Sequence, residues 1–249
     1  MQERSGTLGE TPLAYRALAG KEPGVVFLGG FHSDMTGSKA AYLAEWCATR
    51  GRAYLRFDYS GHGASGGRFE DGTIGGWLAD AAAVLAELTK GPQILIGSSM
   101  GGWIALLLAL RHPERVAGLI GIAAAPDFTE ELMWAQFPQS VRDQIQHEGF
   151  WTRPSAYGDG YPITRALIED GRDHLILGGP ITLDRPVRFL HGQDDPDVPW
   201  QHSLRLAERI TSRDVEVTLI KGGDHRLSTP DNLALLGRTL GALLSENGT

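Results

Sequence analysis

Short apolar runs alternate along most of the chain with longer stretches in which apolar residues recur at helical spacing. The runs that are typical of buried strands are residues 24–28, 53–57, 93–96, 116–122, 187–191 and 215–220. The stretches with helical spacing are residues 38–50, 73–89, 103–110 and 227–244. This alternation predicts an α/β protein with a mostly parallel, twisted sheet that is flanked by helices on both faces.

Two short segments at the start of the chain depart from this alternation. Residues 4–8 and 13–19 are separated by the turn-forming sequence Gly-Glu-Thr-Pro. A turn of this kind between two strand segments indicates an antiparallel pair, which we expect at the edge of the sheet.

The alternation stops at Pro126 and returns with the run at 187–191. We interpret residues 127–180 as a cap inserted into a single domain whose core is residues 1–126 and 181–249. The aromatic and sulfur-containing residues of this insertion are Met133, Trp134, Phe137, Phe150, Trp151, Tyr157 and Tyr161. An aromatic underside would bind an apolar acyl or aryl group, and the alternative is that these side chains only pack the cap onto the core.

Length, charge and cysteine content narrow the class of protein. A chain of 249 residues with 42% hydrophobic residues fits one large α/β domain. A net charge of -7 and the absence of a basic run argue against nucleic-acid binding. The single cysteine, Cys47, excludes an internal disulfide and has the apolar surroundings of a packed thiol. No run reaches the roughly 18 apolar residues of a membrane span, and no basic and apolar leader begins the chain, so we expect a cytoplasmic protein.

The run 97–101, which reads Gly-Ser-Ser-Met-Gly, joins a predicted strand to a predicted helix. A serine between glycines in a strand–turn–helix context is the pattern of a nucleophile elbow, which makes Ser99 the candidate nucleophile. The Met100 N–H would begin the helix, where unpaired amides and the helix dipole can hold a developing oxyanion. The alternative is a tight connection made of small residues with no chemical role.

The predicted strand 24–28 ends in Gly29, Gly30, Phe31 and His32. In serine hydrolases built on such a sheet, the loop after this strand donates the second oxyanion N–H, which we assign to Phe31. The alternative is that the glycine pair only ends the strand.

An acid and a histidine follow the elbow serine in the chain order that this architecture requires. The loop after residues 187–191 holds Asp194, Asp195 and Asp197, and the spacing alone leaves all three open as the acid. His225 comes directly after the last predicted strand, where the general base belongs. With an aspartate holding its tautomer, His225 would take the Ser99 proton as the hydroxyl attacks an acyl carbon, so no metal or cofactor is required.

The other histidines are weaker candidates for the base. His62 precedes the serine in a glycine-flanked loop, where a turn or surface role is expected, and His112 ends a helix. His191 and His202 flank the aspartate loop without following the last strand. Asp58 is expected to bond turn amides through its side chain.

These motifs together resemble the α/β-hydrolase superfamily. The phrases around Glu148-Gly149-Phe150-Trp151 and Asp173-His174 are similar, within it, to the family of mitochondrial S-depalmitoylating thioesterases that are also described as acyl-glucuronide esterases. The resemblance implies the α/β-hydrolase fold and Asp195 as the acid, and it leaves Asp194 and Asp197 as loop neighbours. Since no mitochondrial presequence is evident, the organelle of that family is not carried over.

The leading functional hypothesis is a serine hydrolase of carboxylic esters or thioesters. Its substrates would be small acyl esters or thioesters and, by the resemblance, S-acylated proteins. The alternatives are a catalytically idle receptor of the same fold and a C–C bond hydrolase or perhydrolase that shares the triad. Dehalogenases and epoxide hydrolases need a carboxylate at position 99 and are excluded. Oligomeric state does not follow from the sequence.

Overall fold

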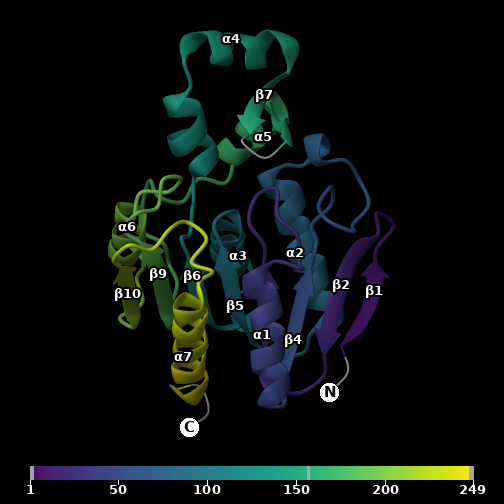
Figure 1. Cartoon of the computed structure of the whole chain (residues 1–249), viewed down its shortest axis with the longest axis vertical. Coiled ribbons are helices and arrows are strands. Elements are labelled where there is room, and N and C mark those ends of the chain that lie inside the picture. Colours follow the sequence, from purple (N-terminus) through teal and green to yellow (C-terminus); the bar gives the residue numbers. More distant parts are fainter. Residues whose placement is uncertain (1–2, 156–157, 247–249) are drawn as a thin grey trace.

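The computed structural model describes residues 3–155 and 158–246 and is built on one eight-stranded sheet (Figure 1). The sheet has the strand order β1-β2-β4-β3-β5-β6-β9-β10. The strands are β1 (Arg4–Leu8), β2 (Leu13–Leu18), β3 (Lys21–Leu28), β4 (Arg52–Phe57), β5 (Gln93–Ser98), β6 (Val116–Ile122), β9 (Val187–Gly192) and β10 (Val215–Ile220). All neighbours from β4 to β10 are parallel, whereas β1 pairs with β2, and β2 with β4, in antiparallel fashion. The predicted α/β-hydrolase sheet and its antiparallel edge are therefore confirmed.

Helices cover both faces of the sheet, and each face has its own hydrophobic core. The helices are α1 (Ser38–Thr49), α2 (Ile74–Leu88), α3 (Met100–Arg111), α6 (Gln201–Arg209) and α7 (Pro230–Glu246). Helices α1 and α7 lie on one face and α2 and α3 on the other (Figure 1). Buried residues of α2, α3 and α6 form one core cluster, and those of α1 and α7 form the other. Because successive strand residues point to opposite faces, Leu95 of β5 joins the first cluster while Ile94 and Ile96 join the second.

One helix boundary differs from the sequence-based prediction. Helix α3 begins at Met100, directly after the elbow serine, where the Met100 N–H was expected to begin the helix. Helix α7 begins at Pro230, and not at residue 227, because Leu227 has a positive φ of 45° and donates its N–H to Asp224 Oδ1. Proline is favoured at the first helical position, which fixes the later start.

The segment between β6 and β9 lies at one end of the sheet (Figure 1). It contains a π-helical turn η3 (Thr129–Met133), a 3-10 turn η4 (Trp134–Gln136), α4 (Gln139–Glu148), the hairpin β7 (Phe150–Ser155) and β8 (Gly158–Thr164), and α5 (Arg165–Arg172). Two further 3-10 turns, η1 (Phe69–Asp71) and η2 (Pro113–Arg115), lie in the loops before α2 and β6. Ile145, Ile163 and Leu167 join the same hydrophobic cluster as α2 and α3. The division into a core and a cap stays a prediction.

One carboxylate ties the start of this segment to its end. Asp127 adopts a positive φ of 58° and accepts hydrogen bonds from the N–H groups of Ile176 and Leu177, both at 2.9 Å. Burial raises the pKa of Asp127, although the two backbone donors oppose that shift. The chain therefore enters and leaves the segment at neighbouring points.

Candidate active site

Ser99 occupies the sharp turn between β5 and α3, with φ +54° and ψ −118°. This region of backbone space is costly for any residue with a side chain and is found at sites where the surrounding structure enforces it. The enforcing contacts are hydrogen bonds from Ser99 N–H to Ile122 O at 2.9 Å and from Ala125 N–H to Ser99 O at 3.1 Å. The turn therefore has the backbone geometry that the elbow motif predicts.

The glycines on either side of Ser99 let α3 approach the sheet closely. A Cβ atom on Gly97 would lie 2.2 Å from Gly101 O, and one on Gly101 would lie 2.1 Å from Leu28 O. Since both contacts are with backbone atoms, a rotamer change could not relieve them. The glycines are thus a steric requirement of the turn.

Ser99 and His225 line one cleft of about 670 Å³ at the carboxyl ends of the strands. Several polar side chains share its wall, namely Ser33, Asp34, Ser38, Lys39, Asp197, Arg226 and Ser228. Burial lowers the pKa of Lys39 to about 8, and its Nζ donates to Arg226 O. The cleft is therefore suited to polar groups of a substrate.

The aromatic residues of segment 127–180 contribute little to this cleft. Among the described residues of the segment, Tyr161 is the one that lines it. Phe137 packs edge-on against Trp151 at 5.3 Å, and Trp134 lies 5.0 Å from the Arg172 guanidinium. Phe150 is 46% exposed. Tyr157 lies outside the described residues. Apart from Tyr161, the expected aromatic underside is not found at this cleft, because Trp134, Phe137 and Trp151 pack against the hydrophobic cluster that α2 and α3 share.

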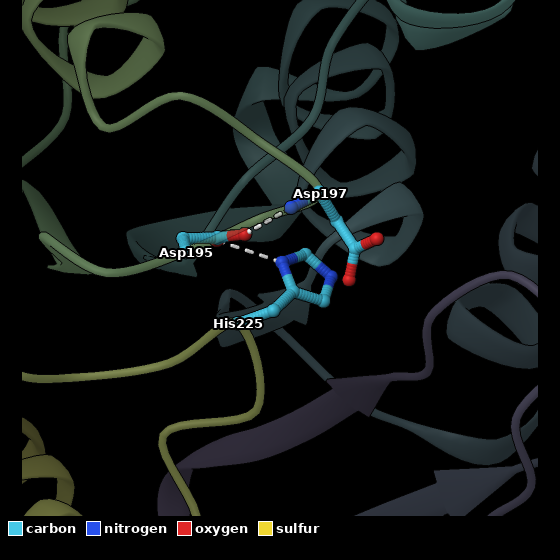
Figure 2. Close-up of side chains that lie close together, drawn as sticks. All are labelled: Asp195, Asp197 and His225. Carbon is cyan, nitrogen blue, oxygen red and sulfur yellow. Dashed lines mark hydrogen bonds and ion pairs between the residues drawn. The ribbon is translucent and has the colours of Figure 1, made fainter.

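Asp195 is hydrogen-bonded to His225. The Nδ1 atom of His225 lies 2.7 Å from Asp195 Oδ2, as Figure 2 shows. The Asp195 side chain is fully buried, and its Oδ1 accepts the N–H groups of Asp197 and Val198 at 2.8 and 2.9 Å. Burial alone would raise the pKa of Asp195, but hydrogen bonds from His191, His225 and Val198 outweigh it and hold the pKa below its usual range. The carboxylate is therefore ionised at neutral pH.

The other two aspartates of the loop have different surroundings. Asp197 is exposed, and its carboxylate lies beside the ring of His225 (Figure 2). Asp194 uses its backbone N–H to bond Gly223 O at 2.9 Å. Asp195, Asp197 and His225 each offer one possible metal-ligand atom, and these three atoms lie within 4.8 Å of one another, a spacing that a metal ion could bridge. Both Asp195 oxygens already accept hydrogen bonds, so a cation there would have to displace them.

The predicted oxyanion amides lie on either side of Ser99, one at the start of α3 and one on the loop after β3. Met100 is the first residue of α3, and the neighbouring loop approaches the serine so closely that a Cβ on Gly30 would lie 3.4 Å from Ser99 Cβ. The Phe31 ring packs edge-on against four aromatic neighbours, Phe69, Trp77, Phe128 and Tyr161. Among residues 3–155 and 158–246, no protein acceptor takes the Phe31 N–H. This amide is therefore available to a ligand.

His62 supports the same loop from behind, a role that sequence reasoning missed. It is buried against Phe69 and Trp77, its Nδ1 lies 3.2 Å from Ser60 O, and its Nε2 lies 3.2 Å from His32 N. Because Ser60 O can only accept and His32 N–H can only donate, the proton is on Nδ1. Burial lowers the pKa of His62, which keeps that neutral form.

Asp58 bonds loop amides, as predicted, and the remaining rival histidines do not reach the cleft. Asp58 accepts the N–H groups of Met35 at 2.6 Å and Ala64 at 2.9 Å. His191 is fully buried and lies 3.2 Å from Asp195, His202 lies 3.4 Å from Glu131, and neither lines the cleft. His225 is therefore the histidine that shares the cleft with Ser99 and also contacts the aspartate loop.

Comparison with known proteins gives the family. A family model described as "Serine aminopeptidase, S33" matches residues 21–151, which is more than half of the chain. The solved structure of mouse alpha/beta hydrolase domain-containing protein 10 superposes with a TM-score of 0.90 at 40% identity and covers 99% of both chains. The chain belongs to the α/β-hydrolase family.

Other α/β-hydrolases extend this comparison. A putative hydrolase from Agrobacterium vitis S4 also superposes with a TM-score of 0.90 at 40% identity, covering 97% of each chain. The mouse protein named palmitoyl-protein thioesterase ABHD10, mitochondrial, is 44% identical over 239 residues, which are 95% of this chain and 80% of that protein. These relatives agree with the expectation of a serine hydrolase of this family and of the thioesterase branch within it.

The predicted cytoplasmic location is wrong in the light of these α/β-hydrolase relatives. The mouse protein and its human counterpart, which is 40% identical over 239 residues, are both named as mitochondrial. Composition and the lack of an apparent leader were the basis of the prediction, and neither reports the compartment of a folded domain. None of the described helices is long and apolar enough to cross a bilayer.

Proposed function

We propose that the protein hydrolyses carboxylic esters and thioesters, with Ser99 as nucleophile, His225 as general base and Asp195 as the acid that orients it. The observation that carries the proposal is the 2.7 Å hydrogen bond between His225 Nδ1 and the buried Asp195 carboxylate, at a cleft that also contains Ser99. A histidine that is bonded to a carboxylate through Nδ1–H has its Nε2 lone pair free to accept a proton.

The reaction begins with attack of Ser99 Oγ on the acyl carbon of the bound substrate. His225 Nε2 takes the hydroxyl proton as the new C–O bond forms, and the Asp195 carboxylate stabilises the resulting imidazolium. The carbonyl oxygen becomes an oxyanion, which the N–H groups of Phe31 and Met100 bind. Collapse of this tetrahedral intermediate expels the thiolate or alkoxide, which takes the proton from His225. An acyl-enzyme remains.

Water then repeats the sequence on the acyl-enzyme. His225 removes a proton from the water as it attacks the acyl carbon, and it returns that proton to Ser99 Oγ when the carboxylic acid leaves. The protein ends in its starting state, and the residues named here move every proton in the cycle.

The character of the cleft supports a substrate with a polar leaving group. The wall around Ser99 carries hydroxyl, carboxylate, ammonium and guanidinium groups, which can pair with an S-acylated peptide or with a sugar ester. The related mouse protein is named a palmitoyl-protein thioesterase, so S-acyl peptides are the first substrates to test. We also assign residues 127–180 to a cap that covers this cleft, on the basis of Tyr161 in its wall.

Two assays test the proposal. The first is labelling by a fluorophosphonate, which reacts with activated serines, and the second is turnover of p-nitrophenyl butyrate and of an S-acyl peptide. Ser99→Ala should abolish labelling and hydrolysis while the melting transition persists. Ser245→Ala, which changes a serine at the far end of α7, is the matched control and should match the wild type. Retention of more than a few per cent of activity by Ser99→Ala would reject Ser99 as the nucleophile. A folded wild-type protein that neither labels nor turns over would favour the idle receptor.

A further inference from the structure

His191 stands at the end of β9, directly behind the loop that carries Asp195. Its side chain has no exposed surface, although it is a polar residue in a strand whose other members are packed into the sheet. It is also absent from the lining of the Ser99 cleft, as far as the described residues define that cleft. Any effect of His191 on the chemistry must therefore pass through another residue.

The contacts of His191 show that its Nε2 atom carries a proton. The Nε2 atom lies 3.0 Å from Val198 O and 3.2 Å from Asp195 Oδ2, and both of these oxygens can only accept hydrogen bonds. The ring proton must therefore be on Nε2. The Nδ1 atom lies 2.7 Å from the buried hydroxyl of Ser203, which can donate to it. With the proton on Nε2 and the Ser203 hydroxyl donating to Nδ1, all three contacts are satisfied.

His191 completes the set of donors around the Asp195 carboxylate. Oδ2 faces two imidazoles, His191 through Nε2 and His225 through Nδ1, and Oδ1 takes two backbone N–H groups. The Nε2–H also reaches Val198 O, so one ring holds the acid and the far end of its loop together. Ser203 on α6 fixes that ring in turn.

We propose that His191 is a positioning residue for the triad, which holds Asp195 Oδ2 in line with His225 Nδ1–H; this inference rests on the proposed function. Without the second donor on Oδ2, the carboxylate could pivot about Oδ1, through coupled changes of its χ1 and χ2 angles, while Oδ1 kept its two backbone amides. His225 would then lose the fixed partner that selects its reactive tautomer.

Two substitutions at this position separate hydrogen bonding from packing. His191→Phe keeps a planar ring and removes the donor, whereas His191→Gln restores an N–H donor at about the position of Nε2. We expect His191→Phe to lower kcat by about 10- to 100-fold, the range for the loss of one hydrogen bond to a charged group, and to leave KM within about two-fold. His191→Gln should recover most of kcat. The control is His202→Phe, which changes a nearby buried histidine outside the triad and should leave kcat within about two-fold.

Nuclear magnetic resonance of the wild-type protein supplies a readout that does not depend on the folding of any variant. Imidazole nitrogen shifts should place the His191 proton on Nε2, and the far-downfield Nδ1–H resonance of His225 should move in His191→Phe and return toward its position in His191→Gln. A proton on Nδ1 of His191 would overturn the proposal. So would a folded His191→Phe with unchanged kcat and an unshifted His225 resonance. If Ser99→Ala kept its activity instead, the proposed function would fail independently of any result at His191.

Discussion

Four hydrogen-bond donors converge on the Asp195 carboxylate, and one of them is His225. We predict that Asp195→Asn lowers kcat on the scale of about 10⁴-fold, as the same change does in a Ser-His-Asp triad, because an amide at this position favours the wrong tautomer of the histidine. Steady-state kinetics with a p-nitrophenyl ester measure the effect. Asp194→Asn is the control and should lose far less, since Asp194 contacts its surroundings through the backbone. A larger loss for Asp194→Asn would move the assignment of the acid by one residue.

We predict that the Lys39 ammonium group makes the free energy of unfolding depend on pH. Burial lowers its pKa to about 8 in the folded protein, against about 10.4 for an unfolded lysine. Between these values the unfolded state holds a proton that the folded state has released, so the Lys39 contribution to the free energy of unfolding rises with pH. Lys39→Gln should remove this rise, and the stability difference between wild type and variant should therefore change between pH 7.5 and pH 10.

Urea unfolding at the two pH values measures this difference. Lys90→Gln, which changes an exposed lysine, is the control for general charge effects and should keep the wild-type pH dependence. An identical pH dependence in wild type and Lys39→Gln would mean that Lys39 does not lose its proton in this window.

The residues that act on others were the hardest to predict. Ser99 and His225 could be proposed as nucleophile and base from chain order, because an elbow and a last strand leave a local pattern. His191 and His62 have no such local pattern. The partners of His191 are Ser203 and Val198, the partner of His62 is the His32 amide, and folding brings each of them close from another part of the chain. The sequence around a histidine at a strand end does not show whether its side chain faces solvent or a buried carboxylate.

At the scale of elements, the contact between α3 and β3 depends on Gly101. We predict that Gly101→Ala lowers the free energy of unfolding by about 3 kcal/mol, at the upper end of the usual cost of overpacking, because the added Cβ would lie 2.1 Å from Leu28 O. Gly178→Ala is the matched control, since its Cβ would meet no atom within 4 Å, and it should change stability by no more than about 0.5 kcal/mol. Urea titration of both variants compares them, and equal stabilities would show that α3 can move away from β3.

Core elements were more predictable than those between β6 and β9. The strand β6 was predicted with its observed bounds because a continuous apolar run can be satisfied only inside a two-sided sheet. The hairpin of β7 and β8 was missed, since Pro154, Pro162 and the glycines of this stretch interrupt the alternation of apolar and polar residues. A two-stranded sheet that lies outside the main core needs little apolar periodicity.

At the scale of the molecule, the polar side chains of the cleft and the packing of residues 127–180 make a prediction about acyl length. Full burial of each methylene would raise kcat/KM about four-fold, from about 0.8 kcal/mol per CH₂. Because Phe137 and Trp151 pack on each other, and Tyr161 is the one described aromatic residue of 127–180 that lines the cleft, we expect a change below about two-fold per CH₂ between C2 and C10. A series of p-nitrophenyl esters or acyl thioesters measures it. A sustained four-fold climb would instead require an apolar channel that opens when the substrate binds.

The backbone of Ser99 has a consequence for how such a protein can change over generations. A side chain at φ +54° and ψ −118° costs on the order of 1 kcal/mol that glycine would not incur, so Ser99→Gly should melt above Ser99→Ala in a thermal scan. Equal melting temperatures would mean that the turn stores no strain. A descendant that no longer needed to hydrolyse a substrate would gain stability from Ser99→Gly. Selection for catalytic turnover opposes this substitution.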